Sequence, residues 1–229
     1  MVFVERNDQD GSVEPTEFLD HDSGPVRDFV HCAVEGAESS REKAVRLYYA
    51  VRDGVDYEVY GSDMSRHGLR ASTIVENGRG FCVHKSVLYA AAVRAVGIPS
   101  RIVVTKVRNH LASDRLRSLV GGDTFVHWLT SVRIDGRWLR ATPVFNRLLC
   151  RLYGMSPLEF DGTSESLYHP FDSRGGERME FLASYGEYDD VDYEGLMALM
   201  RREHPAMFGS EVRIAGEGSL LDEAPVQRA

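Results

Sequence analysis

This chain of 229 residues has few cysteines, no long apolar run and no excess of basic residues. Its three cysteines, Cys32, Cys82 and Cys150, form no CxxC pair and cannot all be joined within one chain, which favours reduced thiols and a cytoplasmic location. No stretch approaches the roughly 18 apolar residues of a membrane-spanning helix. The first residues show no basic region followed by an apolar one, so we expect neither a secretory signal nor a membrane partner.

Other absences narrow the class of protein further. The formal net charge of −8 argues against nucleic acid as a partner. The glycine-rich pieces form neither a P-loop nor a dinucleotide fingerprint. The spacing of a zinc site is not found in the set Cys82, His84, His110 and His127. Two ligands that lie two residues apart on a helix do not face one metal ion, and no second close pair of ligands follows. We therefore expect no metal and no other cofactor.

The apolar pattern predicts an α+β domain in which helices precede strands. The predicted helices cover about 24–36, 40–54, 82–96 and 193–202, and the predicted strands cover 100–107, 125–134 and 137–145. Residues 55–79 and 146–190 show no clear period, and 108–123 are expected to form a loop or short helix. We expect one domain over residues 1–215 and a disordered tail over 216–229.

Gly80-Phe81-Cys82 is the most informative local feature, because it places a cysteine at the start of a buried helix. Backbone N–H groups there are unpaired and the helix dipole is positive, so a thiolate is stabilised. A thiolate is a nucleophile. Cys32 and Cys150 are expected to be small buried residues.

A base for this nucleophile is suggested by a hairpin. Asp135-Gly136 is a strong two-residue turn, which places His127 opposite Val144, with Thr142 and Asn146 as diagonal neighbours on the same face. If the Cys82 helix packs on that sheet, His127 can take the thiol proton and Thr142 or Asn146 can orient the ring.

His84 lies too close to Cys82 along one helix to face it, and we expect it at a solvated rim.

Several of these motifs, in this order, resemble the transglutaminase-like superfamily, whose fold is related to that of the papain-like cysteine proteases. The matching pieces are Gly80-Phe81-Cys82, the segment 94–101, His127 and Asp135-Gly136-Arg137-Trp138. Weaker likeness upstream extends the motif-bearing core to about 18–146. The resemblance implies a papain-like α+β fold, with the cysteine-bearing helix packed on an antiparallel sheet.

The chain departs from the family pattern at one position. Family members usually carry an aspartate where Thr142 stands here, so the chain resembles a bacterial-type branch with Ala-Thr-Pro at this place. A threonine hydroxyl can accept the imidazole N–H, but it lacks the charge that strengthens such a bond roughly twofold. Asn146 is the other candidate, because an asparagine fills this role in papain-like enzymes.

The resemblance implies cysteine-dependent acyl transfer, in which Cys82 attacks an amide, peptide or thioester carbonyl and His127 moves the proton. The acyl group then passes to water, as in a hydrolase, or to an amine, as in a transferase. The expected partners are a peptide, a protein or a small amide or thioester substrate. The candidate substrate contacts are Phe81, His110, Trp128 and His169.

An alternative is a binding or scaffold module that keeps the fold without turnover. Thr142 in place of the aspartate supports that alternative, whereas the retention of both Cys82 and His127 favours an enzyme.

Overall fold

The computed structural model describes residues 11–109, 112–167, 179–208 and 212–223. The helices are α1 (Gly24–Val34), α2 (Ser40–Gly54), α3 (Ala71–Asn77), α4 (Cys82–Arg94), α5 (Asp114–Val120), α6 (Arg147–Leu152) and α7 (Tyr193–Glu203), followed by the short 3₁₀ helix η1 (Pro205–Met207). The strands are β1 (Asp56–Tyr57), β2 (Arg79–Gly80), β3 (Ser100–Asn109), β4 (Thr124–Ile134), β5 (Arg137–Ala141) and β6 (Met179–Tyr188). The predicted α+β fold class is confirmed.

An antiparallel sheet of four strands, in the order β5-β4-β3-β6, forms one layer of the molecule. The predicted hairpin between β4 and β5 is confirmed: Ile134 pairs with Arg137, and both turn residues have positive φ, 50° at Asp135 and 78° at Gly136. Such angles match a type I′ turn, whose twist suits the flanking strands.

The second strand of the hairpin is shorter than predicted. The β4–β5 ladder ends at Thr130 and Ala141, so the predicted pairing of His127 with Val144 does not form. Pro143 follows almost at once, and proline has no N–H to donate to a ladder. His127 pairs instead with Thr105 of β3.

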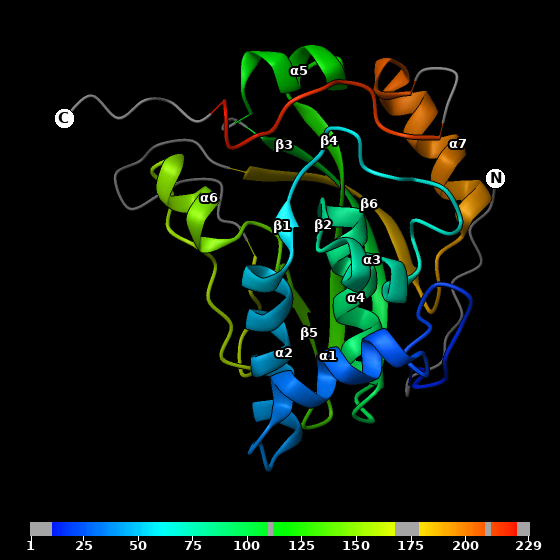
Figure 1. Cartoon of the computed structure of the whole chain (residues 1–229), viewed down its shortest axis with the longest axis vertical. Coiled ribbons are helices and arrows are strands. Elements are labelled where there is room, and N and C mark those ends of the chain that lie inside the picture. The colour runs from blue at the N-terminus through cyan, green and yellow to red at the C-terminus, as the bar shows by residue number, and fades with distance from the viewer. Residues whose placement is uncertain (1–10, 110–111, 168–178, 209–211, 224–229) are drawn as a thin grey trace.

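Helix α4 is the centre of the fold, and all of its residues are buried. It lies against β3 and β4, with α1, α2 and α3 packed around it (Figure 1). Ala90, Ala91 and Ala92 permit close packing, and the Thr130 hydroxyl of β4 donates to the Ser86 carbonyl at 3.0 Å. This packing fixes the start of α4, where Cys82 stands, relative to β4.

Helix α2 is fixed at both ends. Its predicted capping box is confirmed, because the Ser39 hydroxyl accepts from the Glu42 N–H at 3.1 Å and the Glu42 carboxylate accepts from the Ser39 N–H at 3.0 Å. At the other end the buried Lys85 ammonium of α4 donates to the carbonyls of Arg52 at 2.8 Å and Val55 at 2.6 Å. Burial lowers the pKa of Lys85 to about 7.

Two regions without a clear sequence period contain regular structure. Residues 55–79 hold α3 and the parallel pair β1–β2, and residues 146–190 hold α6 and β6. Strand β6 is an edge strand whose pairing with β3 shifts register twice, and its Phe181 and Leu182 are exposed. A bulged strand with exposed apolar residues lacks the alternation that reveals strands in a sequence.

The segment predicted as a disordered tail lies, in its described part, on the body of the domain. Within residues 216–223, Leu220 is buried and its N–H donates to the Glu58 carboxylate at 3.1 Å. Among the described residues, no helix is both long and apolar enough to cross a lipid bilayer.

Candidate active site

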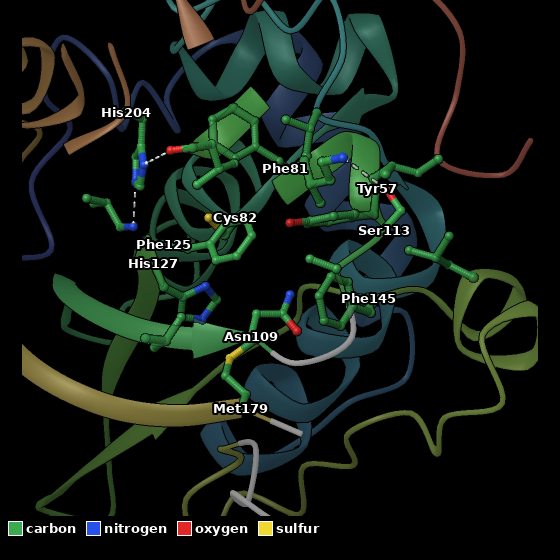
Figure 2. A pocket seen from close by; sticks show the side chains of 18 of the residues that line it. Tyr57, Phe81, Cys82, Asn109, Ser113, Phe125, His127, Phe145, Met179 and His204 are labelled. Carbon is green, nitrogen blue, oxygen red and sulfur yellow. Dashed lines mark hydrogen bonds between the residues drawn. The ribbon is translucent and has the colours of Figure 1, made fainter. Parts of the chain in front are cut away.

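Cys82 and His127 line one largely apolar cavity between the start of α4 and the sheet (Figure 2). Cys82 is the first residue of α4, and His127 comes from β4. Both side chains are buried. The polar or reactive members of the lining that matter below are Tyr57, Cys82, Asn109, Ser113, His127 and His204. The structure therefore brings the two predicted site residues, far apart in sequence, to the same cavity.

The electrostatics of Cys82 differ from the expectation of a stabilised thiolate. Burial raises the pKa of the Cys82 thiol to about 11 and outweighs the backbone N–H groups of Trp128, Val83 and Cys82, which lower it. The donors of the helix start are present, but they do not compensate for the loss of water. At this buried position the thiol is neutral at pH 7, and its ionisation requires a proton acceptor nearby.

His127 has the properties of such an acceptor. Burial lowers its pKa to about 4, so the imidazole is neutral at pH 7 and can take a proton. Its Nε2 atom is buried and has no hydrogen-bond partner within the part of the chain that the structure describes. A buried polar atom without a partner is costly, and a catalytic role is one explanation for its retention.

The two candidate orienting residues have different surroundings. Asn146 caps α6, where its Oδ1 accepts from the Leu149 N–H at 3.0 Å, and its Nδ2 donates to Asp56 Oδ1 at 3.3 Å. Thr142 follows β5 directly and is buried, and its hydroxyl has no partner among the described residues. The Asn146 amide is thus already engaged, whereas the Thr142 hydroxyl is not. Neither residue lines the cavity of Cys82 and His127, and the ladder that would place them as diagonal neighbours of His127 ends before them.

Of the four predicted substrate contacts, two lie within the described residues, and only one of these has its side chain at the Cys82 cavity. Phe81 lines the Cys82 cavity. The Trp128 side chain lines a separate small cavity beside α7, although its backbone N–H reaches the Cys82 sulfur. His110 and His169 lie outside the described residues.

The prediction that His84 lies at a solvated rim is wrong. His84 is buried, its Nε2 lies 3.0 Å from the Asp63 carbonyl, and burial lowers its pKa to about 4. It fits because residue 80 is a glycine: a Cβ there would lie 2.5 Å from His84 Cβ. This close approach explains one glycine of the Gly80-Phe81-Cys82 motif.

The prediction for the other two cysteines is half right. Cys150 is buried, as expected, but Cys32 is exposed. Helix α1 turns this position outward and buries Val26 and Val30 instead.

Tyr57 is a site residue that the sequence analysis missed. The parallel pairing of Tyr57 with Gly80 brings it beside Cys82, and its hydroxyl points into the cavity (Figure 2). Burial raises its pKa well above the usual range, so the hydroxyl stays a hydrogen-bond donor. A two-residue strand leaves no detectable period in a sequence, so no local pattern indicated Tyr57.

Asn109 and His204 complete the polar lining. Asn109 ends β3 and carries its amide into the cavity (Figure 2). The His204 Nε2 accepts from the Val126 N–H at 2.9 Å, and its Nδ1 lies 3.0 Å from the Val120 carbonyl. Both ring nitrogens of His204 are therefore committed to backbone groups, which leaves His127 as the better base. No group of three His, Cys, Asp or Glu side chains in the described ranges is arranged to hold a metal ion.

Comparison with known proteins identifies the family. The model of the transglutaminase-like superfamily matches residues 27–143, just over half of the sequence. The chain belongs to this superfamily, as its motifs predict. Membership supports a cysteine-type enzyme in broad terms. A search of curated proteins found no match.

Three solved structures are similar to parts of this chain. A proposed cysteine protease from Cytophaga hutchinsonii is 17% identical with a TM-score of 0.45, over 75% of this chain and 45% of its own. A TGase is 18% identical with a TM-score of 0.40, over 54% of this chain and 32% of its own. A proposed protease from Parabacteroides distasonis is 16% identical with a TM-score of 0.35, over 50% of this chain and 22% of its own. This chain spans less than half the length of each.

Proposed function

We propose that this protein catalyses acyl transfer through a covalent thioester on Cys82, with His127 as the general base and acid. The observation that carries the proposal is the placement of both side chains in one buried cavity at the start of α4. The neutral thiol and the neutral imidazole are the correct starting forms for proton transfer between them. Membership in the transglutaminase-like superfamily supports the same chemistry.

The reaction proceeds in two halves. The Cys82 thiol proton passes to His127 as the sulfur attacks the substrate carbonyl, and the bond to the leaving group breaks as His127 returns that proton to it. Water or an amine then loses a proton to His127 and attacks the thioester. The acid or the new amide leaves, and the proton returns to the Cys82 sulfur.

The negative charge on the carbonyl oxygen needs donors at the same place. The Cys82 backbone N–H and the Tyr57 hydroxyl are the donors that we assign to this role, because both lie at the Cys82 end of the cavity. An oxyanion donor that is held in position is worth about 10²–10³ in rate. Thr142 is the residue that we assign to orienting His127, because it directly follows β5, the strand paired with the His127 strand β4, and its hydroxyl is uncommitted, whereas the Asn146 amide caps α6.

The proposed substrates are an amide, peptide or thioester, free or within a protein. The cavity lining is mainly apolar, with Val107, Phe125 and Leu116 among its members. Such a lining suits an aliphatic or aromatic side chain next to the reacting carbonyl.

Acylation by p-nitrophenyl acetate tests this function directly. We expect a burst of p-nitrophenolate and an acetyl group on Cys82, located by mass spectrometry of peptides. Cys82→Ala should abolish both, and His127→Ala should reduce the rate by about 10²–10⁴. Cys150→Ala is the matched control, because that thiol is also buried but lies outside the cavity. Acetylation of Cys82 at the rate of an ordinary thiol, unchanged in His127→Ala, would favour a binding module without turnover.

A further inference from the structure

Residues 216–223, called the strap here, run over the Cys82 cavity and contribute one side chain to it. Leu220 is buried and lines the same cavity as Cys82 and His127. Its neighbour Leu221 is exposed. Figure 1 shows the strap, in red, passing beside α5. Leu116 of α5 lines the same cavity. The strap therefore presents one aliphatic side chain to the site and leaves the next in solvent.

The main chain of Leu220 is held by two side chains, those of Glu58 and Tyr153. Its N–H donates to Glu58 Oε2 at 3.1 Å, and its carbonyl accepts from the Tyr153 hydroxyl at 2.9 Å. Glu58 is itself fixed, because its other oxygen accepts from the N–H groups of Val59 at 2.8 Å and Tyr60 at 3.0 Å. When a protein binds a peptide, hydrogen bonds to the peptide main chain contribute affinity, and pockets for the peptide side chains contribute specificity. The contacts of Leu220 have both features.

Charged contacts anchor the two ends of the strap. The Glu223 carboxylate accepts from the Ser113 hydroxyl at 2.5 Å and lies 3.3 Å from the Arg115 guanidinium. Arg115 also donates to the Glu217 carbonyl. Both anchoring residues belong to the start of α5, an element that also lines the cavity.

We propose that the strap is an intramolecular peptide ligand of the Cys82 site, with Leu220 in the subsite that receives an aliphatic side chain of a peptide substrate. This inference rests on the proposed function for its meaning, since a substrate subsite requires a reaction. The strap and a peptide substrate exclude each other, so the subsite is closed to peptide substrates while Leu220 is in place.

The three cysteines of the chain allow a test within one experiment. The protein is treated with iodoacetamide at pH 7, and the alkylation rate of each cysteine is followed by mass spectrometry of peptides. The rate at the exposed Cys32 measures the intrinsic reactivity of the reagent, and the rate at Cys82 measures access to the cavity. The rate at the buried Cys150 measures general loosening of the core. The variants are Leu220→Ser and, as the matched control, Leu221→Ser. Tyr153→Phe removes only the donor to the Leu220 carbonyl.

We expect Leu220→Ser to raise the Cys82 rate by about tenfold or more, since it removes most of the apolar burial that holds the strap in place. Tyr153→Phe should raise the rate by a smaller factor, and Leu221→Ser should leave it unchanged. Cys32 and Cys150 should keep their rates in every variant. An unchanged Cys82 rate in Leu220→Ser would overturn the proposal, as would a parallel rise at Cys150, which would show general loosening.

A synthetic peptide with the sequence of residues 214–226 tests recognition separately. Added to the Leu220→Ser protein, it should return the Cys82 rate toward that of the wild type, whereas the same peptide with serine at the position of Leu220 should not. Equal effects of the two peptides would overturn the subsite assignment. These outcomes are distinguishable from those of the proposed catalysis, because alkylation by iodoacetamide reports access to Cys82, whereas the comparison of the wild type with His127→Ala by the acetate ester reports proton transfer.

Discussion

At the residue scale, burial acts on Cys82 and His127 in opposite directions and keeps both neutral. It raises the pKa of the thiol to about 11 and lowers that of the imidazole to about 4. The ion pair that a cysteine enzyme uses therefore does not form spontaneously in the closed cavity. A group that stabilises imidazolium would favour it, and the family usually has a carboxylate where Thr142 stands.

Thr142→Asp should accelerate acetylation of Cys82 by p-nitrophenyl acetate. A carboxylate there would raise the pKa of His127 and favour the imidazolium that forms when the thiol loses its proton. Thr142→Val is the matched control, because it keeps the shape and removes only the unpartnered hydroxyl. If Thr142 orients His127, the valine variant should be slower than the wild type. Identical rates in all three proteins would remove Thr142 from the site.

At the element scale, the start of α4 depends on tight packing between β2 and the first turn of the helix. Gly80 ends β2 and has no room for a Cβ, because His84 stands 2.5 Å from where that atom would lie. His84 cannot easily move, since it is buried and bonded to the Asp63 carbonyl. The position of Cys82 thus follows from a glycine and a histidine that have no chemical role in the proposed reaction.

Gly80→Ala should lower both stability and the acylation rate of Cys82. Forcing a methyl group into a packed site costs about 1–3 kcal/mol, and the shift of His84 moves the first turn of α4. The measurements are urea unfolding and acetylation by p-nitrophenyl acetate. Gly78→Ala is a comparison of a different kind, because that glycine has open space around its Cβ position but a φ of 60°. It should lose stability without slowing acylation; equal slowing in both variants would contradict the account.

Lys85→Met should destabilise the protein without changing the acylation rate. It removes two donors to the buried carbonyls at the end of α2, which costs about 1–3 kcal/mol for each carbonyl left without a partner. Urea unfolding at pH 6 measures the loss. A stability equal to that of the wild type would show that the Lys85 bonds do not secure α2 to α4.

Most elements with a strong local signal could be predicted from the sequence. The Ser39 capping box, the Asp135-Gly136 turn and the long apolar helix from Cys82 each depend on residues close in sequence. The rest of the site, beyond Cys82 and His127, could not be predicted from the sequence. Tyr57 enters through a two-residue strand, and His84 is buried only because Gly80 leaves it room. Both depend on contacts that a local pattern does not record.

At the scale of the whole molecule, buried histidines couple stability to pH. The pKa values of His84 and His127 are about 4 in the folded protein and near 6.5 when exposed. Between these values the unfolded chain binds more protons than the folded one, so stability falls as pH falls from about 6.5 to 4. Each histidine contributes up to about 1.4 kcal/mol per pH unit.

His84→Gln should reduce this pH dependence by the share of one histidine. The measurement is the free energy of unfolding in urea at pH values from 4 to 7, compared between the variant and the wild type. We expect the difference between the two proteins to change by about 1 kcal/mol per pH unit across this range. A constant difference would mean that His84 has the same pKa in the folded protein as in the unfolded chain. The overall stability of the variant does not decide the matter; only the slope does.

The placement of the strap could not be predicted from its composition. Residues 216–223 are polar and glycine-containing and are predicted to be disordered, yet Leu220 is buried in the cavity. The contacts that hold it come from Glu58 and Tyr153, far away in sequence.

The cytoplasmic location and the single-domain organisation stay predictions.

The pH dependence of Cys82 acetylation, measured with p-nitrophenyl acetate in the wild type and in His127→Ala, tests the central claim most directly. We expect the wild-type rate to reach its plateau well below pH 9, because His127 supplies the base. The rate of His127→Ala should be about 10²–10⁴ lower at pH 7 and should keep rising toward pH 11, where the buried thiol ionises. Superimposable profiles in the two proteins would contradict the assignment of Cys82 and His127 as a catalytic pair.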